Sequence, residues 1–230
     1  MLPTLMFISG TLDAGMFLLM VLMHATRKTS LLITLYVLQS LLVACFFVIA
    51  AIEESSPFLF VVAGVTILTK ALLVPVLYRR VMRRLGARFA SDTYLDTPWT
   101  LVVLAGIAVL SFSVVRMTMP GALFSTVSPV LAYAPLHLAG ILATLFLAVN
   151  RKEAFSQVIA LLALENWVVF VAALAGFHQT LALELAVTLE TIVLVLISVF
   201  FMTMVHERFG SLDISKMTHL SERDEPETHI

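Results

Sequence analysis

The fold is decided by two consecutive apolar stretches, FSQVIALLALENWVVFVAALA (155–175) and LALELAVTLETIVLVLISVFFMTM (181–204). Each is long enough to cross a bilayer as a helix, which takes ~20 mostly apolar residues. Each also carries a carboxylate well inside the stretch, Glu165 in the first and Glu190 in the second. Because a charge at that depth costs about 2.5 to 3.5 kcal/mol on insertion scales, such residues usually face a bundle interior and serve a function.

The composition of the whole chain indicates an integral membrane protein. Of its 230 residues, 60% are hydrophobic and 13% are charged, whereas soluble domains carry about 25% charged residues. The net charge of −1 gives no basic surface for nucleic acid. The single cysteine, Cys45, lies in an apolar run, which excludes a disulfide or a cysteine metal site within the chain.

Seven stretches are long and apolar enough to span a membrane, so we expect an all-α bundle of about seven transmembrane helices. They are 3–23, 30–51, 58–78, 98–115, 127–149, 155–175 and 181–204. The first is longer than a signal peptide core and has no basic start, so we expect a retained helix.

The basic residues predict the orientation of the bundle, because cytoplasmic loops are enriched in Lys and Arg. Twelve of the 14 lie on one side of the predicted spans: Arg27, Lys28, Arg79, Arg80, Arg83, Arg84, Arg88, Arg151, Lys152, Arg208, Lys216 and Arg223. Arg116 is the one predicted to lie in a loop on the other side, and Lys70 lies within a span. This bias predicts an N-terminus outside and a C-terminus in the cytoplasm.

The order of these features predicts four parts. They are an N-terminal three-helix membrane unit at 1–96 with a basic cytoplasmic segment at 79–90, a connector helix and loop at 97–126, a second three-helix unit at 127–210, and a cytoplasmic tail at 211–230. The basic segment is either a topological anchor or a binding site for acidic lipid headgroups. Arg27-Lys28 and Arg151-Lys152 open corresponding spans of the two units, which indicates either an internal repeat or a chance similarity of apolar helices.

Glu165 and Glu190 are predicted to lie at matching depth. At 1.5 Å per residue, Glu165 is ~15 Å from the cytoplasmic start of its span and Glu190 is ~13 Å from the outer start of the next. A short connection makes the two spans an antiparallel hairpin, so both carboxylates can occupy one layer of the bundle. A buried carboxyl can accept and release protons, which makes the pair a candidate for proton translocation.

Lys70 and His137 are further candidates for proton translocation. Lys70 lies in the third predicted span, and Pro75, five residues later, cannot donate a hydrogen bond to the carbonyl of Ala71. His137 follows Pro135, and histidine titrates near physiological pH. Asp13, in the first span, has no predicted role. The alternative for all these residues is purely structural, as hydrogen bonds between helices or, for Lys70, as a side chain that reaches toward the cytoplasm.

No motif in the chain indicates a catalytic site, a metal site or a bound cofactor. The glycines are scattered, and we find neither a phosphate loop, nor metal-ligand spacing of His, Cys and carboxylates, nor a nucleophile elbow.

Four segments resemble the E-type membrane subunit of hydrogenase-4 and formate hydrogenlyase-like complexes. They are RKTSLLITLYVLQSL (27–41), LTKALLVPVL (68–77), NRKEAFSQVIALLALEN (150–166) and ELAVTLETIVLVLISVFFMTMVHERFGSLDISKM (184–217). The C-terminal half is also similar to the K subunit of respiratory complex I and to the C subunit of Mrp-type antiporters. By this resemblance the membrane glutamates of those families correspond to Glu165 and Glu190, and Lys70 and His137 match polar positions of the E-type subunit. Gln39 stands where the repeat would place an acid.

The resemblance implies a subunit without its own catalytic site, which translocates protons in a complex I-like oxidoreductase of the group 4 hydrogenase or formate hydrogenlyase type. It implies antiporter-like membrane subunits, a membrane anchor like the quinone-site subunit, and peripheral subunits that hold iron–sulfur clusters and a nickel-iron site. The location would be the cytoplasmic (inner) membrane of a bacterium or archaeon. The alternatives are a subunit of a cation/proton antiporter, another ion-coupled transporter, and a structural membrane scaffold.

Overall fold

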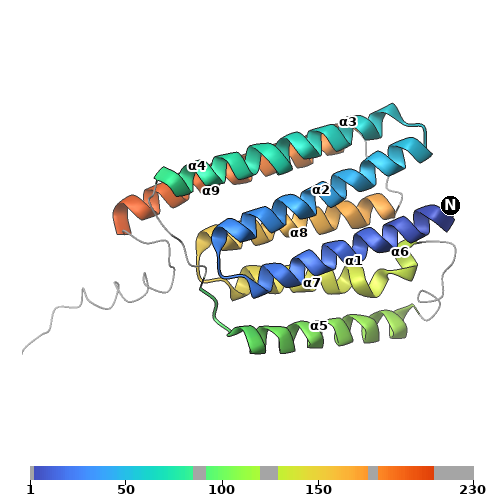
Figure 1. Ribbon diagram of the computed structural model, residues 1–230, viewed down its shortest axis with the longest axis horizontal. Helices are drawn as coiled ribbons and strands as arrows, with labels where there is room; N and C mark the ends of the chain where they lie inside the picture. Colours follow the sequence, from blue (N-terminus) through green and yellow to red (C-terminus); the bar gives the residue numbers. More distant parts are fainter. Residues whose placement is uncertain (1–2, 85–91, 120–128, 176–180, 210–230) are drawn as a thin grey trace, which may run out of the picture.

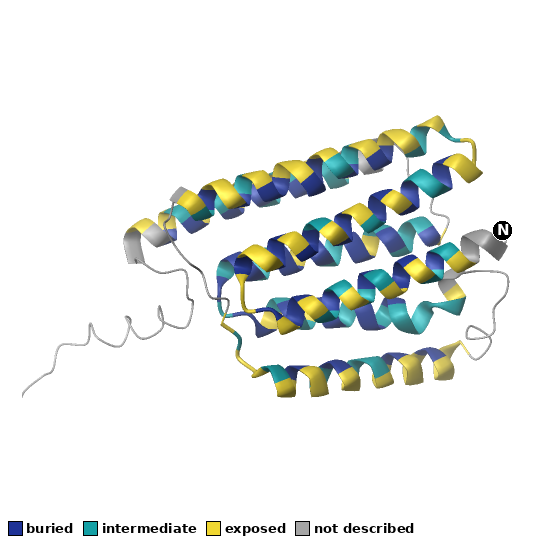
Figure 2. Cartoon of the chain, in the orientation of Figure 1, coloured by how far each residue is buried: buried dark blue, intermediate teal, exposed yellow. Residues whose placement is uncertain are grey.

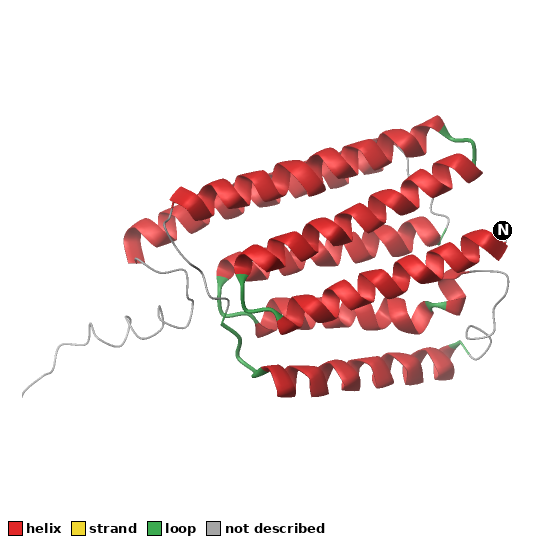
Figure 3. Cartoon of the chain, in the orientation of Figure 1, coloured by secondary structure: helices red, strands yellow, loops and turns green. Residues whose placement is uncertain are grey.

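The computed structural model of the protein is a bundle of long helices (Figure 3). It describes all residues except 1–2, 85–91, 120–128, 176–180 and 210–230. The elements are α1 (Pro3–Ala25), α2 (Thr29–Glu53), α3 (Pro57–Thr66), the π-helix η1 (Ile67–Leu73), α4 (Val74–Arg84), α5 (Thr97–Thr118), α6 (Pro129–Ala132), α7 (Ala134–Asn150), α8 (Ala154–Leu174) and α9 (Leu181–Phe209). The described residues contain no strand, although Thr93 and Arg151 form an isolated β-bridge. The predicted all-α class is therefore confirmed.

The helices lie in two layers (Figure 1). One layer holds α1, α2 and the continuous run of α3, η1 and α4. The other holds α7, α8 and α9, so that α1 packs on α7, α2 on α8, and α4 on α9. Helix α5 lies at one edge, against α7 and α1. The two layers correspond to the predicted three-helix units, and their common origin stays a hypothesis.

Six described helical runs are long and apolar enough to cross a membrane: Phe7–Ala25, Thr29–Glu53, Pro57–Arg83, Thr97–Thr118, Ala154–Leu174 and Ala186–Val205. The stretch predicted as a span at 127–149 differs from these. Its described part is divided by a turn at Tyr133 into α6 and α7, and α7 has only 17 residues. The division follows from Pro135 in the first turn of α7, because proline has no N–H for an interior helical hydrogen bond. The predicted tail at 211–230 lies outside the described residues.

The described part of the predicted basic segment, 79–84, lies in helix α4. Val74 and Tyr78 are buried, whereas Arg79, Arg80 and Arg83 are exposed. The helix thus packs one face on the bundle and directs these three arginines outward, as expected of an amphipathic helix at a surface. Residues 85–90 of the predicted segment lie outside the described part of the chain.

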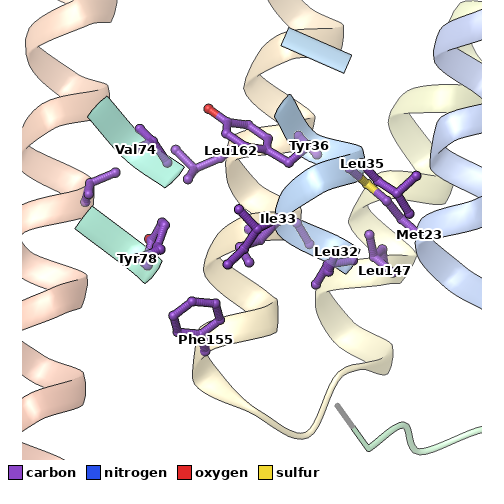
Figure 4. Close-up of a cluster of buried hydrophobic side chains, with 14 of the residues drawn as sticks. Met23, Leu32, Ile33, Leu35, Tyr36, Val74, Tyr78, Leu147, Phe155 and Leu162 are labelled. Atoms are coloured by element: carbon purple, nitrogen blue, oxygen red, sulfur yellow. The ribbon is translucent and has the colours of Figure 1, made fainter. Parts of the chain in front are cut away.

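Buried side chains form two main apolar clusters, and Figure 2 shows buried positions on the faces that the helices turn toward one another. Figure 4 shows the cluster at the end of the bundle where α2, α4 and α8 meet, with Tyr36, Tyr78 and Phe155 among its members. The rings of Tyr78 and Phe155 meet edge to face with centroids 4.7 Å apart. The second cluster lies further along α2 and α8, where α1 and α3 also contribute, and it includes Trp167 and Phe170. Several polar residues of the candidate site lie along the helices between these two clusters.

Candidate functional site

The centre of the candidate site is an ion pair between Lys70 on η1 and Glu165 on α8. The Lys70 Nζ lies 2.9 Å from the Glu165 Oε1, and the side chains are 5% and 19% exposed. Both residues were sequence predictions, although the contact between them was not predicted. A lysine so deeply buried is rare unless it is paired, so Glu165 is the group that accommodates the charge of Lys70.

Helix α9 supplies a third group to this ion pair. The Thr191 hydroxyl lies 2.6 Å from the Glu165 Oε1 and 2.9 Å from the Val187 carbonyl of its own helix. The carboxylate of Glu165 therefore joins η1, α8 and α9 at one point. Thr191 had no predicted role, and the only signal for it in the sequence is its position next to Glu190.

Lys70 is positioned by an unusual backbone. Residues Ile67–Leu73 form a π-helix, in which the Val74 N–H bonds to the Thr69 carbonyl, five residues earlier. Such segments are rare and often occur at functional sites. In this spacing the carbonyl that Pro75 leaves without a helical donor belongs to Lys70. The prediction from the sequence assigned this carbonyl to Ala71, because it assumed α-helical spacing. That prediction is wrong by one residue.

A second buried pair joins α1 of the first layer to α7 of the second. The His137 Nε2 on α7 lies 2.9 Å from the Asp13 Oδ2 on α1, and both side chains are buried. The His137 ring also faces the Phe170 ring edge to face, with centroids 6.4 Å apart. Asp13 had no predicted role. A signal was present, since Asp13 stands as far before Arg27 as His137 stands before Arg151, which places both at similar depth.

Amide and hydroxyl groups lie between the helices that carry these pairs. The Asn166 amide on α8 donates to the Ser40 hydroxyl on α2 at 2.9 Å, and Ser40 donates to the Tyr36 carbonyl. Gln39 is fully buried, and neither of its amide atoms bonds to another described residue. Buried polar atoms of this kind usually bind ordered water. Asn166 follows Glu165 directly on α8. The Asn166–Ser40 hydrogen bond therefore lies next to the Lys70–Glu165 ion pair along this helix.

Glu190 is placed differently from the prediction of a shared interior. Its neighbour Thr191 contacts Glu165, so this turn of α9 lies at the depth of Glu165, as predicted. However, successive helical residues point roughly 100° apart, and Glu190 is exposed on the outer side of α9. Within the described residues no side chain bonds to it. The structure therefore brings Lys70 to Glu165 and Asp13 to His137, and it leaves Glu190 apart from both pairs.

Arg151 lies at the end of the bundle where most of the basic residues are found, and it links α1 to the junction of α7 and α8. Its guanidinium is fully buried and donates to the carbonyls of Met23, near the C-terminus of α1, and of Thr26, which follows that helix. Burial lowers the pKa of Arg151 to about 10, against an opposing effect of Glu153. The side chain thus stays charged at neutral pH. The sequence predicted only a topological role for it.

Comparison with known proteins gives no relative: no protein-family model matches the chain, and neither a curated protein nor a solved structure is significantly similar to it. Among the described residues, no group of three or more His, Cys, Asp or Glu side chains is placed to hold a metal ion. The described site holds two contacts between an acid and a base, Glu165 with Lys70 and Asp13 with His137.

Proposed function

We propose that this chain is a proton-translocating membrane subunit of a complex I-like oxidoreductase, of the group 4 hydrogenase or formate hydrogenlyase type. The observation that carries the proposal is the buried contact of Lys70 with Glu165 and Thr191. A scaffold could hold its helices together with uncharged polar groups, which cost less to bury than two charges. Redox chemistry, iron–sulfur clusters and a nickel-iron site would belong to partner subunits.

The proposed topology has seven spans, with α6 and α7 together forming the fifth. The N-terminus lies outside and the C-terminus lies in the cytoplasm of a bacterial or archaeal cell. The exposed arginines of α4 and the buried Arg151 then belong to the cytoplasmic side. In this frame Lys70, Glu165 and Asn166 lie near the membrane midplane.

The proposed chemistry is a reversible proton transfer within the ion pair. When the Lys70 ammonium gives a proton to the Glu165 carboxylate, an amine and a carboxylic acid result, and neither group remains charged. Burial disfavours either charge alone, so a change in the charge of a neighbouring group shifts this balance. The neutral lysine can then take up a proton from one side while Glu165 releases its proton to the other.

The proposed route runs across the bundle rather than along one helix. It begins at the Asp13–His137 pair, passes Ser40 and Asn166, and reaches Lys70 and Glu165. It continues by way of Thr191 toward Glu190 and an antiporter-like neighbour. His137 and Glu190 keep the translocating roles predicted for them, and Asp13 is added as the partner of His137.

The proposal is tested by replacing both glutamates in the native complex. The variant Glu165→Gln with Glu190→Gln should keep assembly and redox turnover partly intact, and proton uptake into inverted membrane vesicles should fall by at least roughly tenfold. The matched control is Glu207→Gln, since Glu207 is an exposed carboxylate on α9 beyond the apolar run. Wild-type proton uptake in the double variant would refute the proposal. Purification in mild detergent decides the class, because antiporter subunits without hydrogenase subunits would indicate a cation/proton antiporter instead.

A further inference from the structure

Helices α5 and α9 form opposite edges of the bundle, and both have exposed apolar side chains. On α9 these include Leu189, Ile197 and Phe200. On α5 they include Val109 and Leu110. An exposed apolar face on a membrane helix is what lipid contact requires, so these side chains alone do not indicate a protein partner.

The two faces differ in one respect. Between Trp99 and Val115, α5 has no ionisable side chain, and its exposed face is therefore compatible with lipid along the apolar part of the helix. The exposed face of α9 contains Glu190. The contact of Thr191 with Glu165 places this carboxylate near the middle of α8, far from either end of the bundle. A carboxylate exposed to lipid at that depth is costly, and such residues almost always face protein or a water-filled cavity.

We propose that the outer face of α9 binds a transmembrane helix of another membrane protein, and that this helix places a lysine or arginine opposite Glu190. A basic side chain compensates the buried charge and supplies hydrogen-bond donors to it. The apolar side chains around Glu190 would then pack against the same helix. The inference rests on the proposed function in one respect, since it names the chemistry of the neighbour toward which protons would pass.

A second copy of this chain does not fit the face. Two α9 helices related by a two-fold axis would place one Glu190 beside the other, and like charges in an apolar interface repel. The described membrane-spanning runs also have no free base to offer away from their ends. Within the described membrane-spanning runs, Lys70 is the lysine or arginine that lies away from the helix ends, and it is bonded to Glu165. The partner must therefore bring its own basic residue.

The placement links such a partner to the candidate site. Glu190 and Thr191 are consecutive residues, and Thr191 bonds to the carboxylate that pairs with Lys70. A cation held at Glu190 would thus act on the Lys70–Glu165 pair across a single turn of α9. Movement of that cation, or loss of its proton, would change the field at Glu165.

Site-specific photocrosslinking in native membranes tests the proposal. A photoreactive amino acid is placed at Ile197 on α9, which is 62% exposed, and the matched control is placed at Val109 on α5, which is 66% exposed. Ile197 lies two helical turns from Glu190 on the same side. We expect the Ile197 probe to crosslink to a membrane span that contains a lysine or arginine, and the Val109 probe to crosslink to lipid. Lipid alone at both positions, a crosslink to a second copy, or a span without a basic residue would overturn the proposal.

The role of the charge is tested in the same assay. Glu190→Gln should lower the yield of the Ile197 crosslink by roughly tenfold or more, because one member of a buried charge pair is lost. Glu190→Lys should abolish the crosslink, and replacement of the partner's basic residue by glutamate should restore it. Glu190 is exposed, so the amount of full-length chain in the membrane should stay unchanged. An undiminished crosslink with Glu190→Gln would refute the charge pairing.

The outcome is distinguishable from the test of the proposed function. Glu165→Gln should abolish proton translocation and leave the Ile197 crosslink intact, since Glu165 does not face the partner. If translocation survives in every variant while Glu190→Gln removes the crosslink, the binding surface stands and the proposed function fails.

Discussion

Gly140 on α7 lies where the indole of Trp167 crosses from α8. A methyl group at Gly140 would come within 2.5 Å of the indole carbon Cζ2 of Trp167. The Trp167 side chain is fully buried, so neighbouring atoms enclose its ring. This close approach brings α7 and α8 together one turn beyond His137. The packing of the polar residues therefore depends on the absence of a side chain at one position.

Gly140→Ala is expected to destabilise the bundle by about 1–3 kcal/mol, the usual effect of overpacking a well-packed interior. Gly106→Ala on α5 is the control, because nothing lies within 4 Å of the added methyl group. It should leave stability unchanged or raise it by up to about 1 kcal/mol through helix propensity. Thermal unfolding in detergent measures both. An equal effect of the two substitutions would contradict the packing argument.

Lys70 and Glu165 are expected to stabilise each other. Lys70→Met or Glu165→Gln alone leaves one buried charge without its partner, at a cost of about 3–5 kcal/mol. The double variant removes both charges and should be more stable than the sum of the single effects predicts. Urea or thermal unfolding of the four proteins in one detergent gives the coupling free energy. Strict additivity would show that the pair does not form.

At the level of helices, the apolar length of the sequence predicts most positions. The predicted spans 3–23, 30–51 and 98–115 fall inside α1, α2 and α5. Three features could not be predicted in this way. The π-helix depends on the neighbours of η1, the Asp13–His137 contact depends on the packing of α1 against α7, and the outward direction of Glu190 depends on which face α9 turns to the bundle. Apolar periodicity is uninformative for this last choice, because a membrane helix is apolar on all sides.

Arg151 is expected to hold the end of α1 against the junction of α7 and α8. Arg151→Ala leaves the carbonyls of Met23 and Thr26 without this buried donor, which costs about 1–3 kcal/mol for each such group. Arg151→Lys should recover part of the loss, since lysine donates from a single point. The exposed Arg83→Ala serves as the control. If the Arg151 variants lose no more thermal stability than Arg83→Ala, the capping role is contradicted.

For the whole molecule, the two-layer arrangement fixes which loops share a side. The turn after α2, with Ser55 at a φ of 50°, lies at the opposite end from the α1–α2 and α7–α8 junctions (Figure 1). Consecutive long helices alternate in direction, so one orientation determines the side of every loop. The sequence predicts that orientation through its basic residues.

Cysteine accessibility tests the orientation. In a background where Cys45 is replaced by alanine, a cysteine at Glu54 should react with a membrane-impermeant maleimide in intact cells. A cysteine at Arg80 should react only after permeabilisation, because α4 is proposed to lie on the cytoplasmic side. Both positions are exposed in the structure. The reverse pattern would invert the proposed topology and leave the fold unchanged.

The two described bonds of the Glu165 carboxylate both end on Oε1. Lys70 and Thr191 therefore polarise one C–O bond more than the other, and the bond to Oε2 keeps more double-bond character. The carboxylate should show an unusually wide splitting of its two infrared stretching bands. Removal of the hydroxyl in Thr191→Val should narrow that splitting. The splitting of the two Glu165 bands is therefore a spectroscopic measure of how closely η1, α8 and α9 approach one another.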